Sequence, residues 1–546
     1  MNPKIRKKIT KEQNLKTVEY HNYLVNELNM SKTFCEYFLV IGIDPRISMR
    51  TYLYNTEPQE ILKYYSHEIK PEILTKFPPM QKNYINIDNS IINICFQDGF
   101  NIKESQTKPK PEISYYLLDN YFYSIEHPHK YITCLKFYES LEQYHELKDK
   151  LQKKLGISYD GKIPKYDGGK SNVINFMNLK EVNEDLDSSI QSNKSDEPID
   201  DIILKKKKNI FKNYYFPKII CLISLQPFYK EQESILNQIY NYSMNNNYDG
   251  KLKNDKSIKQ NIPLEKLVLN ILCNIPMPTK GVFDISYKFY YKDINNGEKK
   301  LEEIIIKRHK YNELDNIDSL ILSMLSFFNS DQLLEMFKYT IYGIKTLVFG
   351  SNTNNICIFI NGLLKMIFPF NYSFQVSSFV PDDVYDVLES ISPYILGINK
   401  EYKESFFKEN EISINEDLMI IDLNNKKLIT KIKKNEDYPD FPKSYYKKLK
   451  SGIDDCIKKY KLNKNNSLNL FSIIFFDFFL NIFSDYSNYL NNDYLKLKNL
   501  LMPIHQMKEI FLKNLLQVRY SVISFLKKCY QRMLMIKWMF FFSMKV

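Results

Sequence analysis

The chain has 546 residues, which is too long for one compact core and predicts about three or four domains. Its formal net charge of +12 rests on lysine, since the sequence contains only six arginines, and a chain so poor in guanidinium groups is badly suited to reading phosphates and base edges. We therefore expect no nucleic-acid partner, whereas the lysines favour peripheral association with an anionic membrane surface.

The N-terminal half begins with a polar segment at 1–33, which has a helical pattern and is predicted as an N-terminal extension. Residues 34–156 form a first α/β module. Strand-like apolar runs lie at 37–42, 91–96 and 131–138, and a helical pattern follows at 139–155. Short strands of this kind predict a central antiparallel sheet.

A linker or inserted loop is predicted at 157–212, where the apolar periodicity is lost. Residues 181–201 are acidic, rich in Ser and Asn and nearly free of aromatic residues, a composition typical of disorder. The densest lysine run, 205–208, lies beside this acidic stretch and is interpreted as solvated.

Residues 213–402 form a second α/β module. Its predicted elements are a strand at 219–224, helices near 231–243 and 263–274, a strand at 281–291, a helix at 331–342, a strand at 344–350, a helix at 356–368 and a helix at about 382–390. The polar turn at 351–355 makes 344–368 a strand-loop-helix unit. The region 403–546 is predicted to be helical after a strand at 418–423, and helical pattern continues beyond Phe441-Pro442.

The cysteines and the chain termini bear on compartment. The eight cysteines show no Cys-x-x-Cys spacing, and most lie in apolar runs, where a free cysteine behaves as a small hydrophobe. This pattern predicts a reducing compartment and no zinc site. No apolar segment follows the basic N-terminus, and the runs at 468–483 and 533–546 fall short of the roughly 20 residues that a spanning helix needs. We expect a soluble, cytoplasmic protein.

Signatures of enzyme chemistry are missing from the sequence. It contains no phosphate-binding loop, dinucleotide fingerprint, zincin motif, serine-hydrolase elbow or kinase signature. We therefore predict a protein that works by binding, with no catalytic residue, metal or cofactor. Asp382 and Asp383 follow Pro381, where carboxylates either complement a helix N-terminus, the favoured interpretation, or contact a partner.

The order of several short motifs resembles the tripartite DENN module. In the upstream part these motifs lie at 37–44, 74–79, 94–99 and 133–139; in the central part at 217–228, 263–265, 275–278, 345–351, 368–370, 380–381 and 387–397; and in the downstream part at 420–425, 441–442, 475–479 and Tyr486. Gln97 stands where the family has a proline. The resemblance covers roughly 34–500, and after about 505 we expect the chain to be divergent or truncated relative to the family.

The resemblance implies both a fold and a function. The fold is α/β, with a longin-like N-lobe at 34–156, a second α/β lobe at 213–402 and an all-helical C-terminal part at 403–546. The function is guanine nucleotide exchange on a Rab-type small GTPase, bound in its nucleotide-free or GDP-bound form, on vesicle membranes and without a cofactor. The positions expected to contact the GTPase are Asp44, Asp382, Asp383 and Asp386.

Two rival functions remain open. A DENN-shaped scaffold would recruit a small GTPase or a trafficking complex without promoting exchange. A DENN-like activating protein would instead supply an arginine finger that stimulates GTP hydrolysis, and Arg46 or Arg50 follows the first strand of the N-lobe.

Overall fold

A computed structural model of the chain describes residues 33–483 with internal gaps, of which the longest lie at 44–69, 120–128, 141–213, 249–263 and 308–324. Packing divides the chain into two compact units. Unit 1 consists of Met1–Ser114 and Tyr131–Lys307, and unit 2 consists of Tyr115–Lys130 and Arg308–Val546. Each unit combines helices with a β-sheet.

Unit 1 is built on an antiparallel sheet that joins distant parts of the sequence. In sheet order, its strands are β5 (His129–Ser140), β6 (Tyr214–Ser224), β1 (Tyr37–Gly42) and β2 (Glu72–Phe77), and the short β3 (Lys103–Glu104) also pairs with β6. The strands predicted at 37–42, 131–138 and 219–224 are confirmed, and so is the antiparallel sheet predicted for the first module. The strand at 219–224, which was predicted to belong to the second module, lies between the other two in this sheet.

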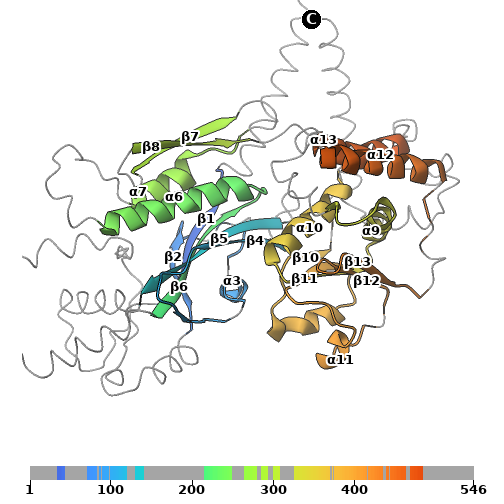
Figure 1. Cartoon of the computed structure of the whole chain (residues 1–546), viewed down its shortest axis with the longest axis horizontal. Coiled ribbons are helices and arrows are strands. Elements are labelled where there is room, and N and C mark those ends of the chain that lie inside the picture. Colours follow the sequence, from blue (N-terminus) through green and yellow to red (C-terminus); the bar gives the residue numbers. More distant parts are fainter. Residues whose placement is uncertain are drawn as a thin grey trace, which may run out of the picture. The chain divides into compact units, whose positions relative to one another are not determined.

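One face of this sheet packs against helices and a hairpin. These elements are α6 (Tyr229–Tyr248), α7 (Leu264–Leu269), the π-helix η3 (Asn270–Asn274), β7 (Ile285–Lys292) and β8 (Lys299–Ile306). Alternating strand residues such as Leu135, Ile220 and Leu222 share a core with Ile235 and Ile239 of α6, because successive side chains of a strand point to opposite faces. Figure 1 shows α6 along this face and α3 (Ser90–Cys95) on the opposite one.

The strand predicted at 91–96 is wrong, because this segment is the helix α3. Isoleucine-rich runs favour strands, and a run this short does not reveal its period. The burial pattern shows the helix: Ile91, Ile94 and Cys95 are buried at spacings of three and four residues, while Asn93 between them is exposed. The helical pattern predicted at 139–155 lies largely outside the described residues, and β5 extends to Ser140.

Unit 2 is built on a mixed sheet. Its strands, in sheet order, are β13 (Lys427–Lys431), β12 (Leu418–Asp422), β9 (Lys345–Phe349), β11 (Tyr394–Ile398) and β10 (Gln375–Ser377). The pairs from β12 to β10 are parallel, and β13 is antiparallel to β12. The end of β4 (Glu112–Asp119) joins the β10 edge: Leu118 pairs with Ser377, and the Leu117 amide donates to Ser378 Oγ at 2.9 Å.

Helices cover both faces of the unit-2 sheet (Figure 1). They are α9 (Ser330–Tyr342), α10 (Thr353–Met366), the 3-10 helix η4 (Asp382–Glu389) and α11 (Phe406–Glu409). Two further helices, α12 (Lys443–Leu462) and α13 (Leu468–Phe483), pack on α9 and α10. The predicted strand-loop-helix unit is confirmed as β9 and α10, and Asn352 caps α10 by accepting from the amides of Asn354 and Asn355.

Aromatic packing attaches α13 to the rest of unit 2. The Phe337 ring of α9 has its centroid 4.7 Å from that of Phe475 and 5.6 Å from that of Phe478. Phe441, which precedes α12, stacks on the same ring at 5.5 Å. The Phe-rich segment of the sequence is therefore a core element, since such ring pairs add to the free energy gained by burying their apolar area.

The domain boundaries predicted from the sequence follow chain order, whereas the compact units do not. Residues 214–307, predicted as the start of the second lobe, pack in unit 1 because β6 pairs with both β1 and β5. The region predicted as helical from 403 contributes β12 and β13 to the unit-2 sheet, and its described part from Lys443 onward is helical. None of the described helices is both long and apolar enough to span a membrane.

Close packing at Gly397 gives a test of the unit-2 fold. A Cβ at this position would overlap the carbonyl oxygen of Ser378 and would lie 2.5 Å from Cγ2 of Ile356. We predict that Gly397→Ala lowers the free energy of unfolding of unit 2 by at least about 1–3 kcal/mol, the usual cost of overpacking. Urea denaturation measures the loss, and amide hydrogen exchange in β9 and β11 localises it.

The matched control is Gly42→Ala in β1, where a Cβ would make ordinary contacts of 3.4 Å with Leu74 and Lys218. We expect this change to leave stability within about 0.5 kcal/mol of the wild type. Equal effects of the two substitutions would contradict the packing described around Gly397.

Candidate functional site

The helix predicted at 382–390 is the 3-10 helix η4, which connects β10 to β11. Val384 has non-helical angles (φ −126°, ψ 25°), so η4 consists of two short turns joined at a kink. Its N-cap residue is Pro381, and Asp382 and Asp383 lie in its first turn. These carboxylates therefore complement the positive end of the helix dipole without capping the helix.

Two buried side chains anchor η4 to the sheet. Tyr385 and Leu388 belong to a core cluster that includes Leu347, Leu396 and Phe406. The centroids of the Tyr385 and Phe406 rings are 5.4 Å apart, and the Tyr394 hydroxyl of β11 donates to the Leu388 carbonyl at 2.9 Å. The outward side of η4 is thus presented from a rigid base.

The carboxylate of Asp382 is held by two neighbours. Lys400 Nζ lies 2.7 Å from Oδ2, and the Tyr385 hydroxyl donates to Oδ1 at 2.8 Å. Burial alone would raise the pKa of Asp382, but the hydrogen bonds from Lys400 and Tyr385 outweigh it and lower the pKa from its ordinary value. Asp382 is an ionised carboxylate whose charge Lys400 partly neutralises, so it is less available to a partner than its neighbours are.

Four other exposed side chains of this region form a surface that we call the η4 patch: Asp383, Val384, Asp386 and Ile391. Ile391 is 87% exposed and Val384 is 42% exposed, although both are apolar. Among the described residues, Asp383 and Asp386 have no ion-pair partner. The patch therefore offers two unneutralised carboxylates beside two apolar side chains, a combination suited to a protein surface with basic and apolar groups.

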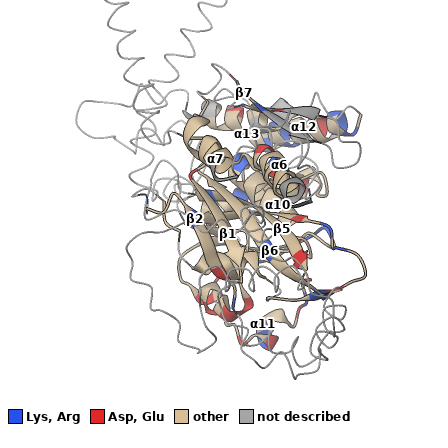
Figure 2. Ribbon diagram, turned by 90° about the vertical axis from the view of Figure 1, so that its left-hand side faces the viewer, with Lys and Arg blue, Asp and Glu red and all other residues tan. Residues whose placement is uncertain are grey.

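The charge pattern of η4 differs from that of other helices in unit 2. The sequence of η4 contains three aspartates and one glutamate and no lysine or arginine. On α11 and α12, by contrast, basic and acidic residues are interspersed (Figure 2). η4 itself consequently carries a negative net charge, which favours a basic partner at the moment of encounter.

The structure brings together only some of the site residues predicted from the sequence. Asp382, Asp383 and Asp386 share η4, whereas Asp44, Arg46 and Arg50 lie outside the described residues. Sequence reasoning missed Val384 and Ile391, because a single exposed apolar residue has no periodic signature. It also missed Lys400, which follows β11 and reaches Asp382 only through the fold.

The absence of close cysteine spacing was a poor guide to the thiols. Cys95, Cys134 and Cys221 are far apart in the sequence, yet their Sγ atoms all lie within 4.8 Å of one another in the core of unit 1. The argument against a metal site therefore fails for these three residues, because strand pairing, and not sequence spacing, brings them together.

Comparison with known protein families identifies one domain in the chain. A model of the DENN (AEX-3) domain matches residues 215–426. The matched span begins in β6, ends between β12 and β13 and contains the whole η4 patch. The parts of the sequence resemblance that lie outside this span remain predictions.

The pairing of Asp382 with Lys400 predicts a shift in titration. Burial raises the pKa of Asp382, and the hydrogen bond from Lys400 lowers it. Lys400→Met removes that hydrogen bond, so we expect it to raise the pKa of Asp382 above its wild-type value. A carboxyl group whose folded pKa is depressed stabilises the fold above its unfolded pKa and loses that contribution as pH falls through the folded pKa. The variant should therefore lose less stability on acidification.

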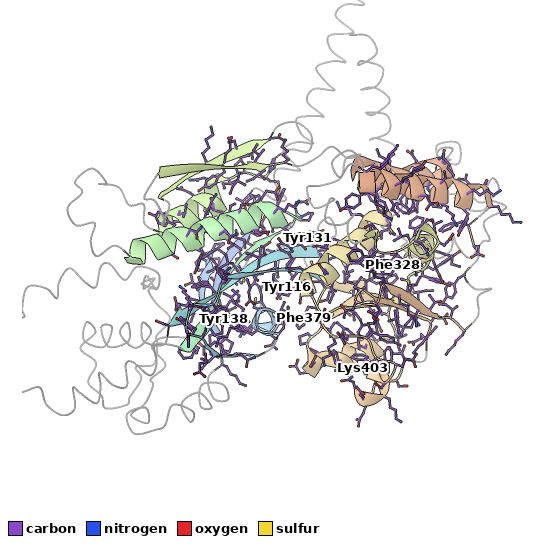
Figure 3. All side chains as sticks on the ribbon, in the orientation of Figure 1. Tyr116, Tyr131, Tyr138, Phe328, Phe379 and Lys403 are labelled. Atoms are coloured by element: carbon purple, nitrogen blue, oxygen red, sulfur yellow. The ribbon has the colours of Figure 1, made fainter. Side chains whose placement is uncertain are left out.

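Carboxyl-carbon NMR of aspartate-labelled protein measures the pKa directly. Lys403→Met is the control, because Lys403 is an exposed lysine near α11 (Figure 3). An unchanged pKa in Lys400→Met, or an equal rise in Lys403→Met, would show that Lys400 does not hold the Asp382 carboxylate.

Proposed function

We propose, because the chain is a DENN domain-containing protein, that it is a guanine nucleotide exchange factor for a Rab-type small GTPase. DENN domains are known in regulators of this type, which act without covalent chemistry. On this proposal the protein works at the cytoplasmic side of vesicle membranes, where its GTPase partner would reside.

The observation that carries the proposal for this chain is the η4 patch. It lies within the matched domain, it is exposed, and it is anchored by Tyr385 and Leu388. A rigid surface loses little conformational entropy on binding, and exposed apolar side chains supply the free energy of a protein contact. Asp383 and Asp386 would add steering and specificity, since complementary charges mainly raise the association rate.

Exchange requires that the factor bind one state of the GTPase more tightly than the other. A protein that binds the nucleotide-free GTPase better than the GDP-bound form shifts the equilibrium toward GDP release. An equal affinity for both would shift nothing, and a change from 1:99 to 99:1 needs a difference of about 10⁴-fold, or about 5.5 kcal/mol. Such a factor needs binding surfaces and no catalytic side chain.

The central prediction is accelerated GDP release. The full chain should speed the loss of a fluorescent GDP analogue from at least one member of a Rab panel. The double charge reversal Asp383→Lys/Asp386→Lys should lower the rate of GDP release by at least about 10-fold when the concentration of the exchange factor limits the rate. The reason is that like charges facing each other across an interface are strongly unfavourable. The reduction should be smaller at high salt, which screens exposed charges.

The matched control is Asp454→Lys/Asp455→Lys on α12, which makes the same change of charge at two adjacent exposed aspartates outside the matched span. It should leave exchange unchanged. If the wild-type chain accelerates GDP release from no GTPase of the panel, the exchange proposal is wrong. Preferential capture of the GTP-loaded form without exchange would instead identify a recruiting scaffold.

The apolar part of the patch gives a separate prediction. Ile391→Ala removes about three methylene equivalents, so burial at an interface predicts a loss of about 2.4 kcal/mol, or roughly 50-fold in affinity for the nucleotide-free GTPase. Leu462→Ala at the end of α12 is the control, since Leu462 is 80% exposed and lies outside the matched span. Equal affinities of the two variants would remove Ile391 from the interface.

A further inference from the structure

Three cysteines from three elements of unit 1 meet in its core. Cys95 is the last residue of α3, and Cys134 and Cys221 lie on β5 and β6. The Sγ–Sγ distances are 3.6 Å between Cys95 and Cys134, 3.8 Å between Cys95 and Cys221, and 2.9 Å between Cys134 and Cys221. The three thiols thus form a triangle, which we call the thiol triangle.

The register of the sheet produces this arrangement. Cys134 and Cys221 are directly opposite each other on the antiparallel pair β5–β6, so both side chains point to the same face. This face is the one opposite to Leu135 and Ile220, which pack against α6. Helix α3 covers it and supplies the third sulfur. On β5, Cys134 lies between Tyr131 and Tyr138, both labelled in Figure 3.

The three cysteine side chains are almost fully buried. The exposed fractions are 6% for Cys95, 2% for Cys134 and 0% for Cys221. A single buried cysteine is ordinarily a small hydrophobe and needs no ligand. Three thiols converging from separate elements are different, because their sulfur atoms surround one point of the core and each can offer one ligand atom to a metal ion there.

The dimensions of the thiol triangle suit a metal ion. A metal–sulfur distance of about 2.3 Å places the sulfurs of a trigonal or tetrahedral site about 3.8–4.0 Å apart. Two edges, 3.6 and 3.8 Å, are close to this value as they stand. The third, 2.9 Å, has to open by about 1 Å, a movement within reach of the cysteine side chains.

The burial of the triangle also bears on its charge. Three thiolates in a buried site require a positive charge at the centre, because a buried charge is costly unless it is paired or coordinates a metal. A bound metal supplies that charge and deprotonates its thiol ligands.

We propose that Cys95, Cys134 and Cys221 bind a thiophilic metal ion in a three-coordinate, all-sulfur site, and that copper(I) is the ion that fits it best. Soft thiolate ligands select copper(I) and zinc(II) among the common ions. Structural zinc sites are almost always four-coordinate, and the described residues offer no fourth His, Cys, Asp or Glu ligand at this cluster. Three sulfurs in a buried core therefore favour copper(I).

Metal titration of the full chain tests the proposal. Reduced protein carrying Cys273→Ser, which removes an exposed thiol, is titrated with copper(I) in the absence of oxygen against a chromogenic copper(I) chelator. We expect one equivalent bound more tightly than in the triple variant that also carries Cys95→Ser, Cys134→Ser and Cys221→Ser. The triple variant cancels any contribution from the remaining cysteines.

Single variants identify the ligands. Loss of an outer-shell partner already costs about 10- to 100-fold in metal affinity, so Cys95→Ser, Cys134→Ser or Cys221→Ser should each weaken binding by at least about 100-fold. Cys35→Ser is the matched control, because Cys35 is a buried cysteine of unit 1 that contacts Gln232 and not the thiol triangle. It should leave the affinity unchanged.

A second measurement on the wild-type sequence avoids any doubt over the folding of the variants. X-ray absorption of the copper-loaded protein should show three sulfur ligands and no nitrogen or oxygen ligand, and loading should raise the melting temperature. Nitrogen or oxygen ligands, or equal binding by the triple variant, would overturn the site. Stronger binding of zinc(II) than of copper(I) would overturn the choice of ion. A Cys134–Cys221 disulfide in the oxidised protein, together with no metal binding by the reduced protein, would show that these cysteines form a redox pair and not a metal site.

Discussion

The pairing of β6 with β1 on one side and β5 on the other is the constraint on which unit 1 depends. It draws a strand from beyond residue 213 into a sheet whose other members lie before residue 141. One face of that sheet then receives α6, and the other receives α3. Because side chains alternate along a strand, the same register that builds the core under α6 also places Cys134 opposite Cys221 on the other face.

In unit 2 the parallel strands decide where η4 and its exposed side chains lie. Parallel neighbours need a crossover connection, and η4 is part of the connection from β10 to β11. Close packing at Gly397 brings β11 against Ser378 and Ile356, so the sheet is tight beneath this connection. Its inner side is occupied by Tyr385 and Leu388, and its outer side is left with Asp383, Asp386, Val384 and Ile391.

Segments with a clear apolar periodicity could be predicted from the sequence. Short apolar runs, and contacts between residues distant in the sequence, could not. The buried strands at 37–42, 219–224 and 344–350 and the helices near 231–243 and 331–342 carry enough apolar residues to reveal themselves. The run at 91–96 did not, because six residues that satisfy a strand also satisfy a helix with Ile91, Ile94 and Cys95 on one face. The acidic residues of η4 were found, but the exposure of Ile391 and the pairing of Lys400 with Asp382 depend on neighbours that are distant in the sequence.

The sequence by itself determined the class of the fold, the acidic character of the 382–389 segment and the family of the central domain, because hydrophobic period and motif order are local properties that survive without coordinates. The tertiary structure alone decided which strands pair, which carboxylate pairs with Lys400 and which cysteines meet. These outcomes follow from register and burial. A register displaced by one residue would send Cys134 and Cys221 to opposite faces without changing a single residue of the chain.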